Sequence, residues 1–201
     1  HGGTRFQGPV VINGKVLDEL RALISLAPLH QPIQVEMIQQ AMERFPGVPQ
    51  VACFDTAIHH TLPEMTARFP LPRRFWDDGV RKYGFHGLSC ESILDASPEF
   101  RQGRIIIAHL GNGASITGFC DGVSVDTSMG FTPTGGLMMG TRCGDIDPGV
   151  LIHLLREYQM SVDDLDEILN QKSGLLGVSG LSNDVQELLN HQHDENVRLA
   201  I

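Results

Sequence analysis

The sequence predicts an α/β fold, in which a small sheet of consecutive strands is flanked by helices. Residues 104–110 are rich in β-branched side chains, which is typical of a central strand. Residues 114–119 alternate as the next strand, and Asp121 with Gly122 predicts a tight hairpin turn into a third strand over residues 123–125. Segments with apolar residues at helical spacing lie before and after these strands, so the pattern is that of helices around a meander.

Two helices and a short strand are predicted before the meander. Apolar residues recur at helical spacing over residues 16–29 and over residues 35–45, and a Pro-Gly pair ends the second segment. Residues 50–54 predict a short buried strand. This strand would deliver Asp55 at its carboxyl end, where open α/β sheets bind their ligands.

Three helices are predicted after the meander. Each follows a side chain that commonly caps helix N-termini. Asp147 precedes a helix over residues 149–158, and Ser161 precedes a helix over residues 162–169. The third helix starts at Asn183 or Asp184.

Composition limits the classes of function. The chain has 201 residues, 41% of them hydrophobic, which is enough for one large or two small cores. A formal net charge of −9 gives no reason to expect nucleic acid or an anionic membrane as a partner. No apolar run approaches the length of a membrane span, and the four cysteines form no C-x-x-C pair. We therefore expect a cytoplasmic protein with reduced thiols.

A glycine-framed turn, HLGNGAS (residues 109–115), is the strongest single motif. Gly111 and Gly113 lack a Cβ, so the backbone N–H groups between them can approach a phosphate closely. Asn112 adds a neutral donor. Taken alone, such a triplet is more often an ordinary turn, so its surroundings decide the interpretation.

Four further segments are rich in groups that suit an anionic substrate: FDTA (54–57), YGFHG (83–87), DTSMGFTP (126–133) and GLMMGTRCGDIDP (136–148). With HLGNGAS they resemble the acetate kinase family, short-chain acyl phosphotransferases of the actin and sugar-kinase superfamily. The resemblance runs from residue 1 to about residue 190. It implies a ribonuclease H-like fold. Residues 1–57 would be the C-terminal part of the first domain, and residues 58–201 would be the N-terminal part of the second domain and make up most of it.

Three residues are candidates for catalysis. Phosphoryl transfer depends on donors and positive charge around the transferred group, which Arg142 and His86 could supply. Alternatively, Arg142 pairs with Asp145 or Asp147 at the surface, and His86 is a structural histidine. Asp55 is either a helix cap or a carboxylate that serves the reaction centre. The resemblance implies the catalytic roles for Asp55, His86 and Arg142.

The resemblance also implies two sets of binding residues. The set that contacts ATP is His109, Leu110, Gly111, Asn112, Gly113, Asp184, Val185 and Gln186. The set that lines the pocket for the acyl group is Leu29, His30, Phe85 and Pro133. A small apolar pocket with a cation at its mouth suits acetate, although each pocket residue could equally belong to the core. Three positions depart from the family pattern: Gln31 replaces asparagine, Cys90 replaces histidine and Gln186 replaces arginine.

The function implied by the resemblance is that of an acetate kinase, which converts ATP and acetate into ADP and acetyl phosphate with magnesium. The direct ligands of Mg²⁺, a first phosphate loop, an acyl-binding arginine and an adenosine loop are expected outside this chain. We therefore expect a fragment that is inactive by itself, from a protein that forms a homodimer through its second domain. The alternatives are a propionate or butyrate kinase, and a non-catalytic remnant that serves dimerisation or binding.

Overall fold

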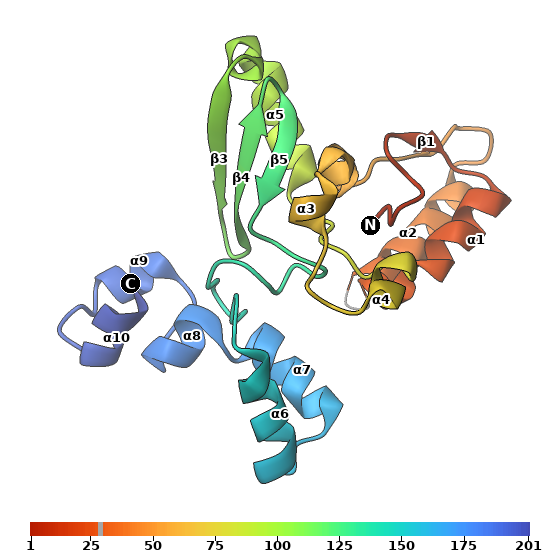
Figure 1. The fold of residues 1–201 in the computed structure, drawn as a ribbon. Helices are drawn as coiled ribbons and strands as arrows, with labels where there is room; N and C mark the ends of the chain where they lie inside the picture. The colour runs from red at the N-terminus through yellow and green to blue at the C-terminus, as the bar shows by residue number, and fades with distance from the viewer. Residues whose placement is uncertain (28–29) are drawn as a thin grey trace. The chain divides into compact units, whose positions relative to one another are not determined.

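The structure is a computed structural model that describes residues 1–27 and 30–201 (Figure 1). The chain divides into two compact units. Unit 1 comprises residues His1–Ile107 and Thr117–Thr127, and unit 2 comprises Ala108–Ile116 and Ser128–Ile201. The predicted domain boundary after residue 57 stays a prediction.

The predicted meander is confirmed. A three-stranded sheet has the order β3 (Arg104–Leu110), β4 (Ala114–Cys120) and β5 (Val123–Thr127). Strand β4 pairs antiparallel with β5, and the register shifts between Gly118 and Phe119. A β-bulge at such a shift bends a strand and increases its twist.

Helix α5 (Gly87–Ala96) packs on this sheet, and the sequence did not predict it. Its core with the sheet contains Cys90, Leu94, Ile107 and Phe119. The helix escaped prediction because its N-cap residue, His86, has a left-handed backbone and makes no side-chain cap. Cys90 is only 1% exposed in this core, and burial raises the pKa of its thiol.

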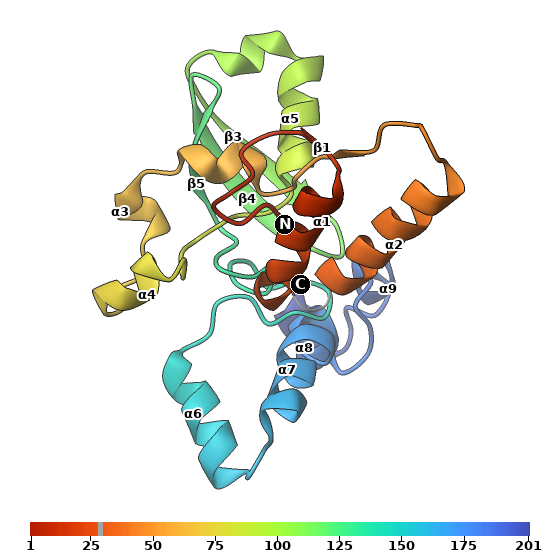
Figure 2. The same cartoon turned by 90° about the vertical axis from the view of Figure 1, so that its right-hand side faces the viewer.

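A second cluster in unit 1 joins helices α1 (Gly14–Ala22) and α2 (Gln31–Arg44), which lie side by side in both views (Figure 2). Helix α1 ends well before residue 29, and the 3₁₀ helix η1 (Ile24–Leu26) follows it. Helix α2 begins earlier than expected because its proline lies in the first turn, where the missing N–H costs nothing. The core of this cluster contains Ile12, Val16, Leu17, Leu20, Val35, Phe54 and Ala57.

The predicted buried strand over residues 50–54 is reduced to β2 (Val51–Ala52), in which Val51 is exposed and not buried. Strand β2 pairs antiparallel with β1 (Val10–Val11). The sequence did not predict β1. Short elements complete unit 1: η2 (Ala57–Thr61), α3 (Glu64–Ala67), α4 (Arg73–Asp77) and η3 (Pro98–Arg101).

The helices of unit 2 largely follow their predicted caps. The elements are α6 (Pro148–Glu157), α7 (Val162–Gln171), α8 (Gly174–Ser179), α9 (Val185–Leu189) and α10 (Glu195–Ala200). Asp147 accepts from the first turn of α6, and Ser161 and Asp164 form a capping box at α7. Asp184 caps α9. The short helix α8, which packs on α10, was not predicted. Throughout the described part of the chain, every helix is too short or too polar to cross a membrane.

Candidate active site

Asp55 is fixed to the beginning of α5 by three hydrogen bonds. Its carboxylate accepts from the N–H of His86 at 2.7 Å and from the N–H of Leu88 at 3.3 Å. Its backbone carbonyl accepts from the N–H of Gly87 at 2.9 Å. A Cβ on Gly87 would lie 2.2 Å from that carbonyl oxygen, so only glycine allows this approach. Asp55 therefore caps a helix whose N-cap residue, His86, lies 31 residues later, rather than the residues that directly follow Asp55.

His86 is held in an unusual backbone conformation. Its φ of 59° lies in the left-handed region, which few residues other than glycine adopt. The bond from its N–H to the Asp55 carboxylate supports this strained residue. Non-glycine residues in this conformation concentrate at functional sites because the surrounding structure must over-determine them. The geometry thus joins two of the three predicted catalytic residues within unit 1.

In unit 2 the glycine-framed turn lies between β3 and β4. The N–H of Gly111 donates to the carbonyl of Gly113 at 3.0 Å, which closes the turn. The N–H of Gly140 donates to the carbonyl of Asn112 at 3.2 Å. The Asn112 side-chain oxygen accepts from the amide of Asn183 at 3.0 Å. The turn is therefore fixed to two loops that come from later in the chain.

Gly140 is essential to this arrangement. A Cβ at Gly140 would lie 2.2 Å from Oδ1 of Asn112 and 3.4 Å from Cβ of Asn183. The absence of a side chain at Gly140 thus lets three segments meet. The sequence predicts Asn183 only as a possible helix start and holds no signal for its bond to a residue 71 positions away.

Arg142 lies two residues after Gly140 and is half-buried. Its Nη1 donates to the carbonyl of Pro133 at 3.2 Å, which brings two predicted site residues together. Burial lowers the pKa of the guanidinium, but an arginine keeps its charge in proteins. The ion pairs of the described residues do not include one between Arg142 and Asp145 or Asp147, and each of these carboxylates accepts a backbone N–H group. The guanidinium retains donors for a ligand.

Comparison with known proteins decides the relationship. The sequence pattern of the Acetokinase family matches residues 1–201. The chain belongs to the acetokinase family. An acetate kinase of Methylocella silvestris is 52% identical over 192 residues, which are 94% of this chain and 48% of that protein. The acetokinase chain thus spans about half the length of the curated relatives it matches.

Solved structures show the same relationship. A crystal structure of a propionate kinase from Francisella tularensis superimposes with a TM-score of 0.95 at 42% identity, covering 100% of this chain and 53% of the other. The crystal structure of Porphyromonas gingivalis acetate kinase gives a TM-score of 0.89 at 40% identity, covering 100% of this chain and 52% of the other. The α/β fold of the actin and sugar-kinase superfamily is therefore confirmed for this acetokinase chain.

The remaining predicted residues of the acetokinase chain have different surroundings. Phe85 is buried, whereas His30 is exposed at the N-cap of α2 and Leu29 lies outside the described residues. His109 is half-buried, and Leu110 is 75% exposed. Asp184, Val185 and Gln186 are exposed at the beginning of α9, next to Asn183 and its bond to the turn. Gln31, one of the departures from the family pattern, is buried and donates to the carbonyl of Leu20 at 3.3 Å.

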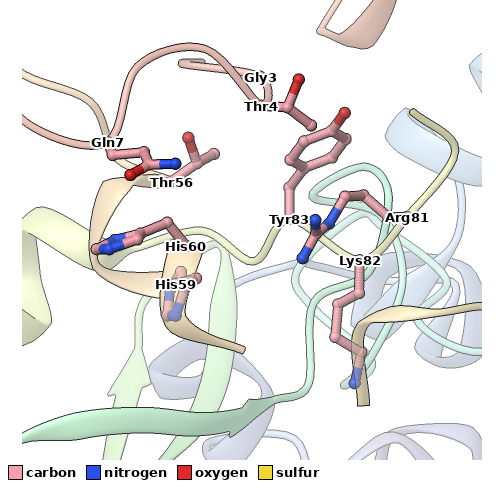
Figure 3. A pocket seen from close by; sticks show the side chains of 9 residues that line it. All are labelled: Gly3, Thr4, Gln7, Thr56, His59, His60, Arg81, Lys82 and Tyr83. Atoms are coloured by element: carbon pink, nitrogen blue, oxygen red, sulfur yellow. The ribbon is translucent and has the colours of Figure 1, made fainter. Parts of the chain in front are cut away.

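A small pocket of about 60 Å³ lies in unit 1 (Figure 3). The residues that line it are Gly3, Thr4, Gln7, Thr56, His59, His60, Arg81, Lys82 and Tyr83. None of the predicted site residues is among them. Within residues 1–27 and 30–201, no three histidine, cysteine or acidic side chains gather into a cluster that could hold a metal ion.

Proposed function

We propose that this acetokinase chain supplies part of the active site of an acetate kinase, which transfers a phosphoryl group reversibly between ATP and acetate. The observation that carries the proposal is the segment from Gly140 to Arg142. It fixes the Asn112 turn through Gly140 and, two residues later, presents a half-buried guanidinium. Backbone N–H groups of a glycine-framed turn and a guanidinium that can bind bidentately both suit the recognition of phosphate.

The reaction needs few covalent steps from the protein. A carboxylate oxygen of acetate attacks the γ-phosphorus of ATP, and a new O–P bond forms as the bond to the β,γ-bridging oxygen breaks. ADP leaves with that oxygen and its electron pair, and acetyl phosphate remains. Negative charge spreads over the three equatorial oxygens in flight, so catalysis rests on positioned donors.

Each residue has a role within this scheme. Arg142 donates to the equatorial oxygens, and the His86 imidazole stabilises the same charge. Asp55 orients His86 through the bond between its carboxylate and the His86 N–H. The turn at residues 109–113 and the beginning of α9 at residues 184–186 contact the nucleotide.

The acyl group of the acceptor lies against Leu29, His30, Phe85 and Pro133 in this proposal. Within unit 2, the bond from the Arg142 guanidinium to the Pro133 carbonyl supports the part of this set that includes Pro133, because it brings a cation next to that residue. A propionate kinase is the second candidate, because the crystal structure of the Francisella tularensis propionate kinase superimposes with a TM-score of 0.95. The two activities differ by one methylene, which a hydrophobic pocket discriminates by only about 1–3 kcal/mol.

Magnesium would neutralise the phosphate charges of the bound nucleotide in such a kinase. Its direct protein ligands are expected outside this chain, and the described residues hold no cluster of three histidine, cysteine or acidic side chains. A homodimer formed through the second domain and a cytoplasmic location complete the proposal.

The test is a hydroxamate assay of acyl phosphate formation by the full gene product with ATP and acetate, propionate or butyrate. We expect turnover with the highest kcat/KM for acetate. A higher value for propionate would establish the second candidate. Failure to form any acyl phosphate would refute the kinase and favour a non-catalytic binding or dimerisation role. The 201-residue chain alone should be inactive, and turnover that Arg142→Ala abolishes would contradict this expectation.

A further inference from the structure

The histidine at position 59 is a buried polar group that the proposed reaction does not use. His59 lies on η2, next to His60 and four residues after Asp55 (Figure 3). Its side chain is 2% exposed, whereas His60 is exposed. Burying an imidazole is costly unless both ring nitrogens have hydrogen-bond partners.

Both ring nitrogens of His59 are hydrogen-bonded, and the partners fix its tautomer. Nε2 lies 3.1 Å from the carbonyl oxygen of Phe85, which can only accept, so Nε2 carries the proton. Nδ1 lies 3.0 Å from the hydroxyl of Ser124 on β5, which therefore donates to it. Burial lowers the pKa of His59, so the ring is neutral and keeps this arrangement near neutral pH.

The ring also supports the residue before Phe85. Gly84 has a φ of +72°, and a Cβ there would lie 2.6 Å from Cδ2 of His59 and 2.6 Å from Cγ2 of Thr127. The backbone of Gly84 thus packs directly on the imidazole. His59 therefore contacts Gly84 and the carbonyl of Phe85. Asp55 binds the N–H of His86, which is the other half of the peptide unit that contains this carbonyl.

We propose that His59 is a positioning residue for His86: its bond to the Phe85 carbonyl and the carboxylate of Asp55 together hold the peptide unit between Phe85 and His86. The catalytic part of this assignment rests on the proposed function. Two residues of one short segment, Asp55 and His59, thus bond the N–H and the carbonyl of that peptide unit. These bonds keep His86, with its left-handed backbone, in a single conformation. The Phe85 ring and the His86 imidazole then stay oriented for the acyl group and the phosphoryl group.

The test separates positioning from general stability with two substitutions at position 59. In His59→Gln, the side-chain amide N–H can reach the position of Nε2 and still donate to the Phe85 carbonyl. In His59→Asn, the shorter side chain reaches only the position of Nδ1 and loses that bond. His60→Gln is the matched control, because the ring of His60 bonds the carbonyl of Ala57 within the same short helix, η2.

The measurement is amide hydrogen exchange by NMR on the 201-residue chain. We expect His59→Asn to speed exchange at the N–H groups of His86 and Leu88 by tenfold or more relative to the paired amides of β4 and β5. His59→Gln should stay within about threefold of the wild type, and His60→Gln should not change it. A uniform increase over all of unit 1 in His59→Asn, or an equal effect of Gln and Asn, would overturn the proposal.

Kinetics on the full gene product address the catalytic part separately. We expect His59→Asn to lower kcat for acyl phosphate formation at least tenfold with an unchanged KM for ATP, and His59→Gln to restore most of it. The exchange experiment needs no turnover. An inactive gene product with the expected exchange pattern would therefore refute the proposed function alone, and an active enzyme in which His59→Asn keeps full kcat would refute the positioning role.

Discussion

Two glycines at equivalent helix positions offer a matched test of how Asp55 is held. Gly87 is the first residue of α5, and Gly14 is the first residue of α1. A Cβ on Gly87 would lie 2.2 Å from the Asp55 carbonyl oxygen, where ordinary contacts start at 3.4 Å, so the two segments must separate by more than 1 Å. A Cβ on Gly14 meets nothing within 4 Å. Alanine should therefore have opposite effects at the two sites.

The magnitude follows from the bonds that this separation breaks. The backbone bond from Gly87 to Asp55 contributes about 0.5–1.5 kcal/mol, and the bond from the His86 N–H to the carboxylate about 1.5–3 kcal/mol. Alanine returns about 0.5–1 kcal/mol through helix propensity, so Gly87→Ala should lose a net ~2 kcal/mol of the free energy of unfolding. Gly14→Ala should raise the free energy of unfolding by about 0.5–1 kcal/mol, because only helix propensity changes there.

The assay is urea unfolding followed by the fluorescence of Trp76, the single tryptophan, which lies in unit 1. With a slope typical of small proteins, Gly87→Ala should lower the midpoint by about 1 M urea. Gly14→Ala should leave it unchanged or slightly higher. Equal midpoints for the two variants would refute the tight approach of Asp55 to α5.

Three other perturbations have defined outcomes. Gly140→Ala should displace the Asn112 side chain from Asn183. The loss of about one hydrogen bond should weaken ATP binding by the full gene product about 2–12-fold, and an unchanged Kd by calorimetry would contradict this. Burial lowers the pKa of His59 in the folded state, so the unfolded chain takes up the proton first as pH falls below ~6.5. Below that pH the free energy of unfolding should therefore fall by up to about 1.4 kcal/mol per pH unit. His59→Gln should flatten that slope in pH-dependent urea unfolding, and a wild-type slope in the variant would exclude the assignment. Ser161→Ala should destabilise α7 by ~1 kcal/mol through the lost capping box, measured by hydrogen exchange in that helix, where unchanged rates would argue against the cap.

Local patterns predicted those parts of the fold whose causes are local. The β-branched run at residues 104–110 is a strand, and the side chains of Asp147, Ser161 and Asp184 cap the helices that follow them. Alternation, turn residues and caps act within a few positions, so a sequence window contains the whole signal.

The features that sequence patterns missed depend on distant residues. Helix α5 begins where Asp55, 31 residues earlier, supplies the acceptors, so no cap is visible near His86 itself. The bond between Asn112 and Asn183 spans 71 residues, and strand β1 exists only because β2 pairs with it. The candidate residues of the site could be named from motifs, but the contacts that fix them belong to tertiary structure.

The proposed function depends above all on the proposal that His86 and Arg142 both stabilise the transferred phosphoryl group. It is tested most directly by kcat for acetyl phosphate formation in the full gene product and in its His86→Ala and Arg142→Ala variants, each checked for folding. Removal of one donor to a developing charge typically lowers kcat about 10²–10³-fold, and we predict losses of that order in both variants. If either variant is folded and retains the wild-type kcat, the substituted residue does not stabilise the transferred phosphoryl group.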